Sequence, residues 1–230
     1  FMKYVTLYLF VFASYFFATK AYSQYYFRIE SDISIKTKIN DESSNLTIGK
    51  AYYNRTLEKL VYSIRFPENE IWLIEDSLMY TIVDNNLIRK QSIIPLLQYT
   101  IFNLVLEGKL SDFGLEKSQY KISKVETDKD LIITTWTSPS HLKKQYGHIV
   151  TSTKNKDLYG VVIFDPSGNI LSKQLFKKYK QIEGIRFPEE IIQVVYSDGK
   201  ESYQLITFKN VQINNLQNES FYNYCLPVAK

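Results

Sequence analysis

The chain of 230 residues is poor in cysteine, glycine and proline. Its single cysteine, Cys225, excludes an intrachain disulfide and any multi-cysteine metal site. Eight glycines and six prolines exclude a collagen-like or linker sequence, and no run is rich enough in glycine to cradle a phosphate. The formal net charge of +4 is too small to indicate a nucleic-acid partner. Because 45% of the residues are hydrophobic and 23% are charged, the composition is that of a folded globular protein.

Histidine is also scarce, since only His141 and His148 are present. No cluster of Asp, Glu or Cys stands near either residue, so the pair is a poor metal signature. A Ser-His-Asp triad can assemble from distant parts of a chain, but the sequence has no Gly-x-Ser-x-Gly elbow for a nucleophile. Cys225 lacks an adjacent base and is typical of a small buried apolar residue. We therefore expect no catalytic residue, no metal and no cofactor.

The first residues carry the signature of a secretory leader. Met2 and Lys3 precede an apolar run that ends at Ala18, and a small-x-small tripeptide ends at Ser23. This pattern predicts a signal peptide over residues 1–23, cleaved before Gln24, and hence an exported protein. The alternative is a membrane anchor, but the run of about 15 residues is shorter than the roughly 20 that span a bilayer. Cleavage would remove two lysines and leave 26 basic against 24 acidic residues, a net charge of +2.

Aromatic residues are abundant, with 19 tyrosines, 14 phenylalanines and two tryptophans. Many fall in short runs that alternate with period two, as in Leu60–Phe66. Similar runs lie at 33–39, 70–74, 78–83, 120–125, 131–136, 148–153, 159–164, 174–179, 191–196 and 203–208. Turn signals rich in Asp, Asn, Pro and Gly separate them. About ten short strands predict one antiparallel sheet, strongly curved or partly closed, in a single domain over residues 24–230.

One segment has helical spacing instead. From Ser92 to Glu107 the apolar residues recur every three to four positions, with Ser92 as the expected N-cap and Gly108 as the expected end. Because the polar face is thin, we expect the protein to enclose this helix almost completely. A second, shorter helix is expected over residues 110–117, with Phe113 and Leu115 pointing inward.

Several strands carry apolar residues on both faces, as in Val161–Phe164. Two interpretations stay open. The apolar excess can fill a solid core covered on both sides, or it can line a cavity enclosed by the concave face of the sheet and the apolar helix.

Five short matches, in one order along the chain, resemble the periplasmic lipoprotein carrier family, the LolA-like proteins. They are Arg55-Thr56-Leu57 leading to Phe66-Pro67, Trp72–Asp76 with Leu78–Tyr80, Ser92–Leu97, Ser202–Leu205, and the closing Phe221 to Pro227. The export signal and the single apolar helix accompany them. The segment 127–148 has no clear counterpart in the family.

The resemblance implies a mainly β member of the α+β class, an incomplete antiparallel β-barrel with a helical lid. It also implies a monomeric, non-enzymatic periplasmic carrier that shelters the acyl chains of lipoproteins, or another lipid, in an apolar cavity during transit to the outer membrane. Membrane-associated donor and acceptor proteins would be its partners. In the family an Arg on an early strand holds the lid through loop carbonyls, and Arg55 stands at the matching position; an exposed turn residue is the alternative.

The candidate cavity residues share apolar or aromatic character and lie on the early strands and the helix. They are Tyr53, Tyr62, Ile64, Trp72, Ile74, Tyr80, Leu97, Ile101, Phe102 and Leu104. A competing hypothesis is an envelope sensor or scaffold that uses the same fold to bind a protein partner, which an exposed apolar patch would favour.

Overall fold

The computed structural model describes residues 25–39, 44–75, 78–92, 101–144, 146–197 and 199–227. The expected leader and Leu97 lie outside these ranges. Thirteen strands occupy most of the described chain. They are β1 (Arg28–Ile39), β2 (Ser44–Asn54), β3 (Lys59–Phe66), β4 (Glu70–Glu75), β5 (Leu78–Val83), β6 (Asn86–Ser92), β7 (Lys121–Asp128), β8 (Leu131–Thr137), β9 (Ile149–Lys154), β10 (Asp157–Phe164), β11 (Ile170–Ile182), β12 (Ile185–Ser197) and β13 (Lys200–Ile213).

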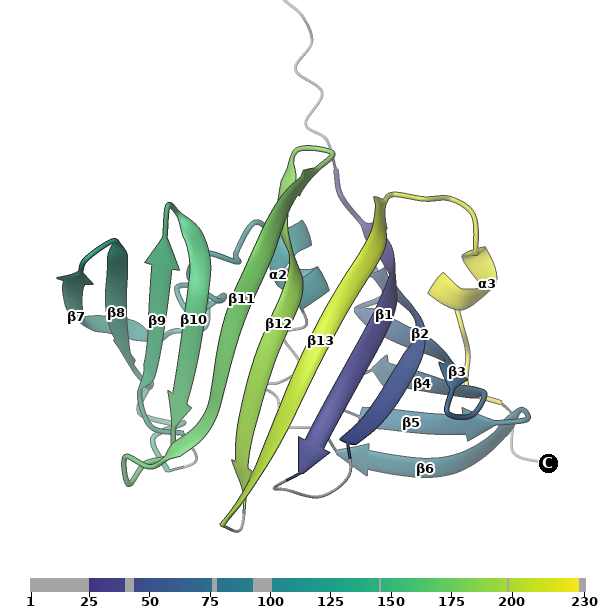
Figure 1. Ribbon diagram of the computed structural model, residues 1–230, viewed down its shortest axis with the longest axis horizontal. Helices are drawn as coiled ribbons and strands as arrows, with labels where there is room; N and C mark the ends of the chain where they lie inside the picture. The colour runs from purple at the N-terminus through teal and green to yellow at the C-terminus, as the bar shows by residue number, and fades with distance from the viewer. Residues whose placement is uncertain are drawn as a thin grey trace, which may run out of the picture.

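The strands form one antiparallel sheet in the order β6-β5-β4-β3-β2-β1-β13-β12-β11-β10-β9-β8-β7. The expected curved, unclosed antiparallel sheet is confirmed: β1 and β11–β13 form its long centre, and the shorter outer strands turn away from it on both sides (Figure 1). Nearly every connection is a hairpin between sequence neighbours. Two features depart from this pattern. β1 pairs with β13, at the other end of the chain, and the segment from β6 to β7 links the two edge strands of the sheet.

Two strands were missing from the alternating runs in the sequence, β2 and β6. β2 carries four consecutive buried residues at its end, Ala51 to Asn54, so both of its faces are covered and the alternation disappears. β6 is exposed along its whole length, so no apolar face marks it as a strand. Asp84 and Asn85 in the turn between β5 and β6 both have positive φ, as a tight hairpin requires.

The helical predictions need correction. The described part of the apolar helix is α2, only Ile101–Leu106. Ser92, the expected N-cap, instead belongs to β6 and pairs with Leu78, because the hydrogen bonds of the hairpin satisfy its backbone. The expected helix over 110–117 is a series of turns, since the left-handed backbone of Phe113 (φ 56°) and Gly114 (φ 73°) is incompatible with a helix. Phe113 and Leu115 are nonetheless buried, as predicted.

The sheet has a hydrophobic cluster on each face. The large cluster contains α2 and the side chains of the face that α2 covers, which we call the concave face; in Figure 1 α2 lies behind β11–β13. The small cluster lies on the opposite, outer face of β2–β5, where α3 (Glu219–Tyr222) packs Tyr222 against Tyr52, Val61 and Leu73. Both faces are therefore covered in part, which explains why several strands are apolar on both sides.

Polar contacts fasten α3 to the outer face. Glu30, buried at 3% exposure, accepts hydrogen bonds from Asn218 Nδ2 and from the Tyr222 hydroxyl, each at 3.0 Å. The Arg28 guanidinium pairs with both carboxylate oxygens of Glu219. Cys225 lies just beyond and is exposed, contrary to the expectation of a buried apolar residue, because the chain after α3 runs along the surface.

Candidate functional site

Five of the predicted cavity residues share the concave face of β2–β4. They are Tyr53, Tyr62, Ile64, Trp72 and Ile74, which all belong to or pack against the large cluster. The strand register places Tyr62 directly opposite Trp72, and Ile74 opposite Leu60. The rings of Tyr62 and Trp72 meet edge to face with centroids 6.2 Å apart. Alternation along each strand therefore gathers these side chains into one apolar surface.

The predicted helix residues Ile101, Phe102 and Leu104 face the same surface from α2. Phe102 is fully buried, and its ring lies 5.4 Å from that of Phe208 and 6.1 Å from that of Phe187. Tyr53 stacks on it from β2 at 6.4 Å. This part of the concave face is thus filled by side chains, whereas Tyr62, Trp72 and Ile74 are half-buried. These three side chains therefore keep part of their surface exposed.

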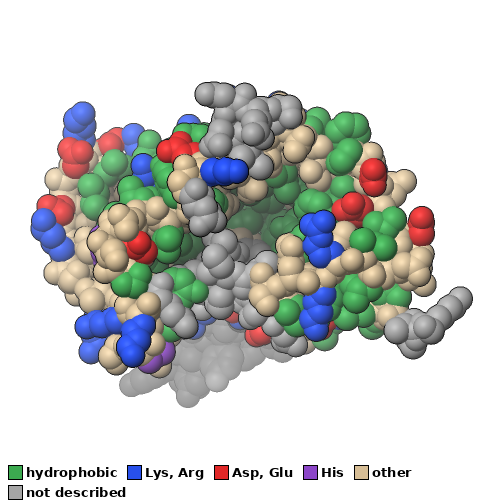
Figure 2. Space-filling model, turned by 90° about the horizontal axis from the view of Figure 1, so that it is seen from below, with side chains coloured by type: hydrophobic (Ala, Val, Ile, Leu, Met, Phe, Trp, Pro, Cys, Tyr) green, Lys and Arg blue, Asp and Glu red, His purple; other side chains and the backbone are tan. Residues whose placement is uncertain are grey.

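The molecule is hollowed on the side seen in Figure 2. Seen from below, hydrophobic side chains gather around a hollow in the middle of the surface (Figure 2). The environment of the tyrosines agrees with an apolar lining: burial raises the pKa of Tyr53 to about 12, and burial likewise raises the pKa of Tyr62. The indole nitrogen of Trp72 donates a hydrogen bond to Glu70 Oε2 at 2.6 Å, which satisfies the one polar group of that side chain.

Tyr80 does not join this group. It lies opposite Leu73 in the β4–β5 register and packs against the small cluster on the outer face. The one-residue alternation of a strand places Met79 and Thr81 on the concave side instead. We therefore remove Tyr80 from the candidate cavity residues. Leu97 lies outside the described residues.

Arg55 follows β2 and reaches the end of α2. Its Nη1 donates hydrogen bonds to the carbonyl oxygens of Tyr26, at 3.3 Å, and Leu106, at 3.4 Å. Its guanidinium also lies over the ring of Tyr25, 5.6 Å from the centroid. Arg55 thus joins the segment before β1 to the last turn of α2.

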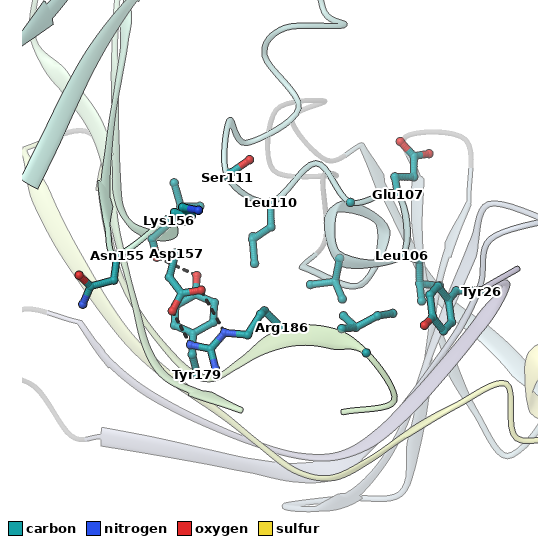
Figure 3. Close-up of a pocket in the computed structure, with 15 residues that line it drawn as sticks. Tyr26, Leu106, Glu107, Leu110, Ser111, Asn155, Lys156, Asp157, Tyr179 and Arg186 are labelled. Carbon is teal, nitrogen blue, oxygen red and sulfur yellow. Dashed lines mark hydrogen bonds and ion pairs between the residues drawn. The ribbon is translucent and has the colours of Figure 1, made fainter. Parts of the chain in front are cut away.

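A pocket of about 690 Å³ lies beside the end of α2. Its apolar wall comes from α2 and the following turn, through Leu106 and Leu110, and from β10 and β12, through Leu158 and Ile185. Figure 3 shows Leu110 pointing into the pocket, with Tyr26 and Leu106 on one side. All four of these apolar side chains are buried at 8% exposure or less, so the wall is part of the core.

The other side of the pocket is polar. Arg186 pairs with Asp157 through Nε and Nη2, and Tyr179 donates its hydroxyl to the carbonyl oxygen of Leu158 at 2.7 Å. These three side chains lie together in Figure 3. Burial raises the pKa of Tyr179, with Asp157 adding to the effect. The side chains of Tyr179, Arg186 and Asp157 thus find hydrogen-bond partners within the pocket wall.

Of the ten predicted cavity residues, none of the nine that the structure describes lines this pocket. Its lining comes from Tyr26, from α2 and the turn after it, and from the β9–β10 and β11–β12 hairpins, which are far apart in the sequence. No motif marks these residues, because only the pairing and curvature of the sheet bring the segments together. The predicted set of cavity residues also omitted Ile33, Phe187 and Phe208, which lie on the concave face. The alternation of the strands is consistent with that placement.

Both histidines lie between β8 and β9. His148 stacks on Phe164 with ring centroids 4.0 Å apart, and His141 is exposed in the loop before β9. Over the described ranges, no group of three His, Cys, Asp or Glu side chains is placed to hold a metal. In the same ranges no helix is long and apolar enough to cross a membrane.

No family model and no curated protein matches the sequence. Three solved structures share its architecture. A LolA superfamily protein from Nitrosomonas europaea has a TM-score of 0.57 and 14% identity, over 84% of this chain and 89% of that one. A DUF1329 family protein from Desulfovibrio piger has a TM-score of 0.63 and 13% identity, over 86% and 90%. A domain from Vibrio parahaemolyticus, described as an outer membrane lipoprotein-sorting protein, has a TM-score of 0.58 and 15% identity, over 84% and 88%.

These similarities extend over most of every chain involved, and TM-scores of 0.57–0.63 at 13–15% identity show a shared fold. They agree with the curved, unclosed antiparallel sheet. The sequence resemblance is thereby confirmed at the level of architecture: the chain has a LolA-like fold.

Proposed function

We propose that this protein is a non-enzymatic carrier that shelters acyl chains, of a lipoprotein or another lipid, on the concave face of its sheet. The observation that supports this most is the half-buried apolar surface of Tyr62, Trp72 and Ile74 beside the filled core. A 16-carbon chain exposed to water costs on the order of 12 kcal/mol, at about 0.8 kcal/mol per CH₂. A soluble carrier must therefore cover the chain, and an apolar recess does so.

Release requires a second state of similar free energy. The described residues of α2, Ile101–Leu106, bury five of their six side chains, so packing against the sheet holds them in place. Its last carbonyl accepts a long hydrogen bond from Arg55. We propose that Arg55 is the latch of this lid and that α2 moves when cargo enters.

The leader pattern at residues 1–23 supports export, and with the fold it supports a periplasmic location and transit of cargo to the outer membrane. Membrane-associated donor and acceptor proteins would then load and unload the carrier, which we propose to act as a monomer built from one domain over residues 24–230.

One observation favours the second candidate, a sensor or scaffold for a protein partner. Ile122, Val125 and Ile132 on β7 and β8 are 51–57% exposed. These strands form one edge of the sheet, where a partner strand can add. A carrier also needs contacts with partner proteins, so an exposed edge fits both functions. Lipid binding is the property that distinguishes a carrier from a sensor or scaffold.

The test is lipid content and uptake. Protein purified mildly from the periplasm of expressing cells is extracted, and the extract is analysed by mass spectrometry; the stripped protein is titrated with a fluorescent fatty acid. Ile74→Gln should weaken binding about tenfold, because a polar group replaces part of an apolar contact surface. The matched control is Ile48→Gln on the outer face, where Ile48 is 43% exposed. Protein that carries no lipid and takes up no fatty acid would contradict the carrier function.

A further inference from the structure

Three glutamines stand side by side on the central strands. Gln174 of β11 lies directly opposite Gln193 of β12, which lies directly opposite Gln204 of β13. Neighbouring strands are about 4.8 Å apart, so the row spans about 10 Å. Thr37 of β1 continues it beyond Gln204. Four adjacent strands thus carry uncharged hydrogen-bonding side chains at one level of the sheet.

The row faces the concave side. Gln174 is two residues from Phe176, and Gln193 is two residues from Ile191. Phe176 and Ile191 both belong to the large cluster. Gln204 is likewise two residues from Ile206, which packs against that cluster. Side chains two apart in a strand share a face, and no register shift interrupts these pairings. The glutamines are therefore on the same face as α2 and the half-buried aromatic residues.

The outer face at this level is apolar. The neighbouring row contains Leu175, Ile192 and Leu205 in direct register. A sheet with one packed and one solvated face normally carries its polar residues outside. On β11–β13 that order is inverted at the level of the three amides.

The amides are available for a ligand. All three side chains are of intermediate exposure, and among the hydrogen bonds of the described residues none involves their side-chain amides. Each amide offers two donors and a carbonyl acceptor. Placing such groups on a half-enclosed face costs free energy unless a partner satisfies them, and no charged residue stands in the row.

We propose that Gln174, Gln193 and Gln204 bind the uncharged hydrogen-bonding part of an amphiphilic cargo, an ester, amide or hydroxyl group next to its acyl chain. This inference rests on the proposed function and refines it. A glutamine amide both donates and accepts hydrogen bonds, which matches a neutral polar group. A charged group would instead be bound most strongly by a residue of opposite charge.

On β1 the glutamine row is level with Thr37, whereas Tyr62 is level with Ser31, six residues away. About 20 Å of strand separates these two levels, so the acyl chain runs extended from the glutamine row toward the apolar surface of Tyr62, Trp72 and Ile74. The row thereby selects lipids with a neutral polar group over plain hydrocarbon.

The test compares three probes of equal chain length in competition with diphenylhexatriene, a fluorescent hydrocarbon. Hexadecane is the apolar reference, monopalmitoylglycerol represents a free lipid, and N-palmitoyl glycinamide represents an acylated peptide. The readout is the ratio of each polar probe's Kd to that of hexadecane. In Gln174→Leu/Gln193→Leu/Gln204→Leu this ratio should rise at least tenfold, while hexadecane binding is kept. The control Gln181→Leu, exposed on the same strand as Gln174, should leave the ratio unchanged.

The outcomes distinguish the two kinds of lipid and separate failure of this inference from failure of the carrier function. A rise for only one polar probe identifies whether the row recognises a glyceride or an acylated peptide. An unchanged ratio in the triple variant would overturn the inference and leave the glutamines as partners of one another. Binding of no probe by the parent protein would overturn the carrier function itself. Should the triple variant fail to fold by circular dichroism, Gln193→Met supplies the same comparison, with a rise of about threefold expected.

Discussion

Arg55 donates a hydrogen bond from Nη1 to the carbonyl oxygen of Leu106, the last residue of α2, over 3.4 Å. The same nitrogen donates to the carbonyl oxygen of Tyr26. A single guanidinium therefore connects the end of the short helix with the segment that leads into β1. Because carbonyls at a helix end lack partners within the helix, this cation also satisfies part of the end of α2.

Arg55→Met should loosen α2 without unfolding the sheet. Hydrogen bonds from charged groups contribute about 1.5–3 kcal/mol, and at 3.3–3.4 Å these are long, so we expect the low end of that range. Hydrogen exchange of the amides in Ile101–Leu106 should accelerate about tenfold. Arg65→Met, at an exposed position of β3, is the control and should leave that exchange unchanged. Equal rates in the parent and Arg55→Met would show that packing alone holds α2.

Phe102→Ala should destabilise the whole protein. Its ring is fully buried between Tyr53, Phe187 and Phe208, and loss of such a ring costs about 3–5 kcal/mol. Urea unfolding followed by circular dichroism measures the change. Ile122→Ala, at a residue 56% exposed, should cost less than about 1 kcal/mol. A loss below about 1 kcal/mol for Phe102→Ala would mean that α2 does not complete the core.

The C-terminal contacts predict a pH dependence of stability. Hydrogen bonding to Arg28 holds the pKa of Glu219 below its ordinary value, with Asn223 assisting. A lowered pKa stabilises the fold above the pKa of the unfolded chain, and this contribution is lost as the pH falls through the folded pKa. Glu219→Gln should therefore unfold at lower urea than the parent at pH 7, and the difference should shrink as the pH falls below the ordinary pKa of a glutamate. The control is Glu116→Gln, also at an exposed position. A difference between Glu219→Gln and the parent that stays constant over the whole acidic range would contradict this origin.

Alternation predicted most of the sheet because most strands have one packed face. β2 escaped because its end is covered on both sides, by the concave cluster through Tyr53 and the outer cluster through Tyr52. β6 escaped because neither face is covered. Alternating hydrophobicity marks a strand only when one face is buried and the other exposed, so it misses strands with both faces buried or both exposed.

The candidate site was predictable only in part. Tyr62, Trp72 and Ile74 share a face because of local alternation, which the sequence contains. Tyr80 was assigned to the wrong face, since the length of the preceding turn sets which residues of β5 face inward. The glutamine row and the pocket depend on register between distant strands, which no local pattern encodes.

The most direct test of the account uses Trp72, one of the two tryptophans in the chain. The other, Trp136, is buried and donates to Thr151 Oγ1 at 2.9 Å; Trp136→Phe makes Trp72 the sole emitter. Titration with a fatty acid brominated at mid-chain should quench the emission of Trp72 in a saturable manner, because bromine quenches only on close approach, and the unbrominated acid should not quench it. Emission that stays unchanged at saturating brominated acid would contradict the placement of acyl chains on the concave face.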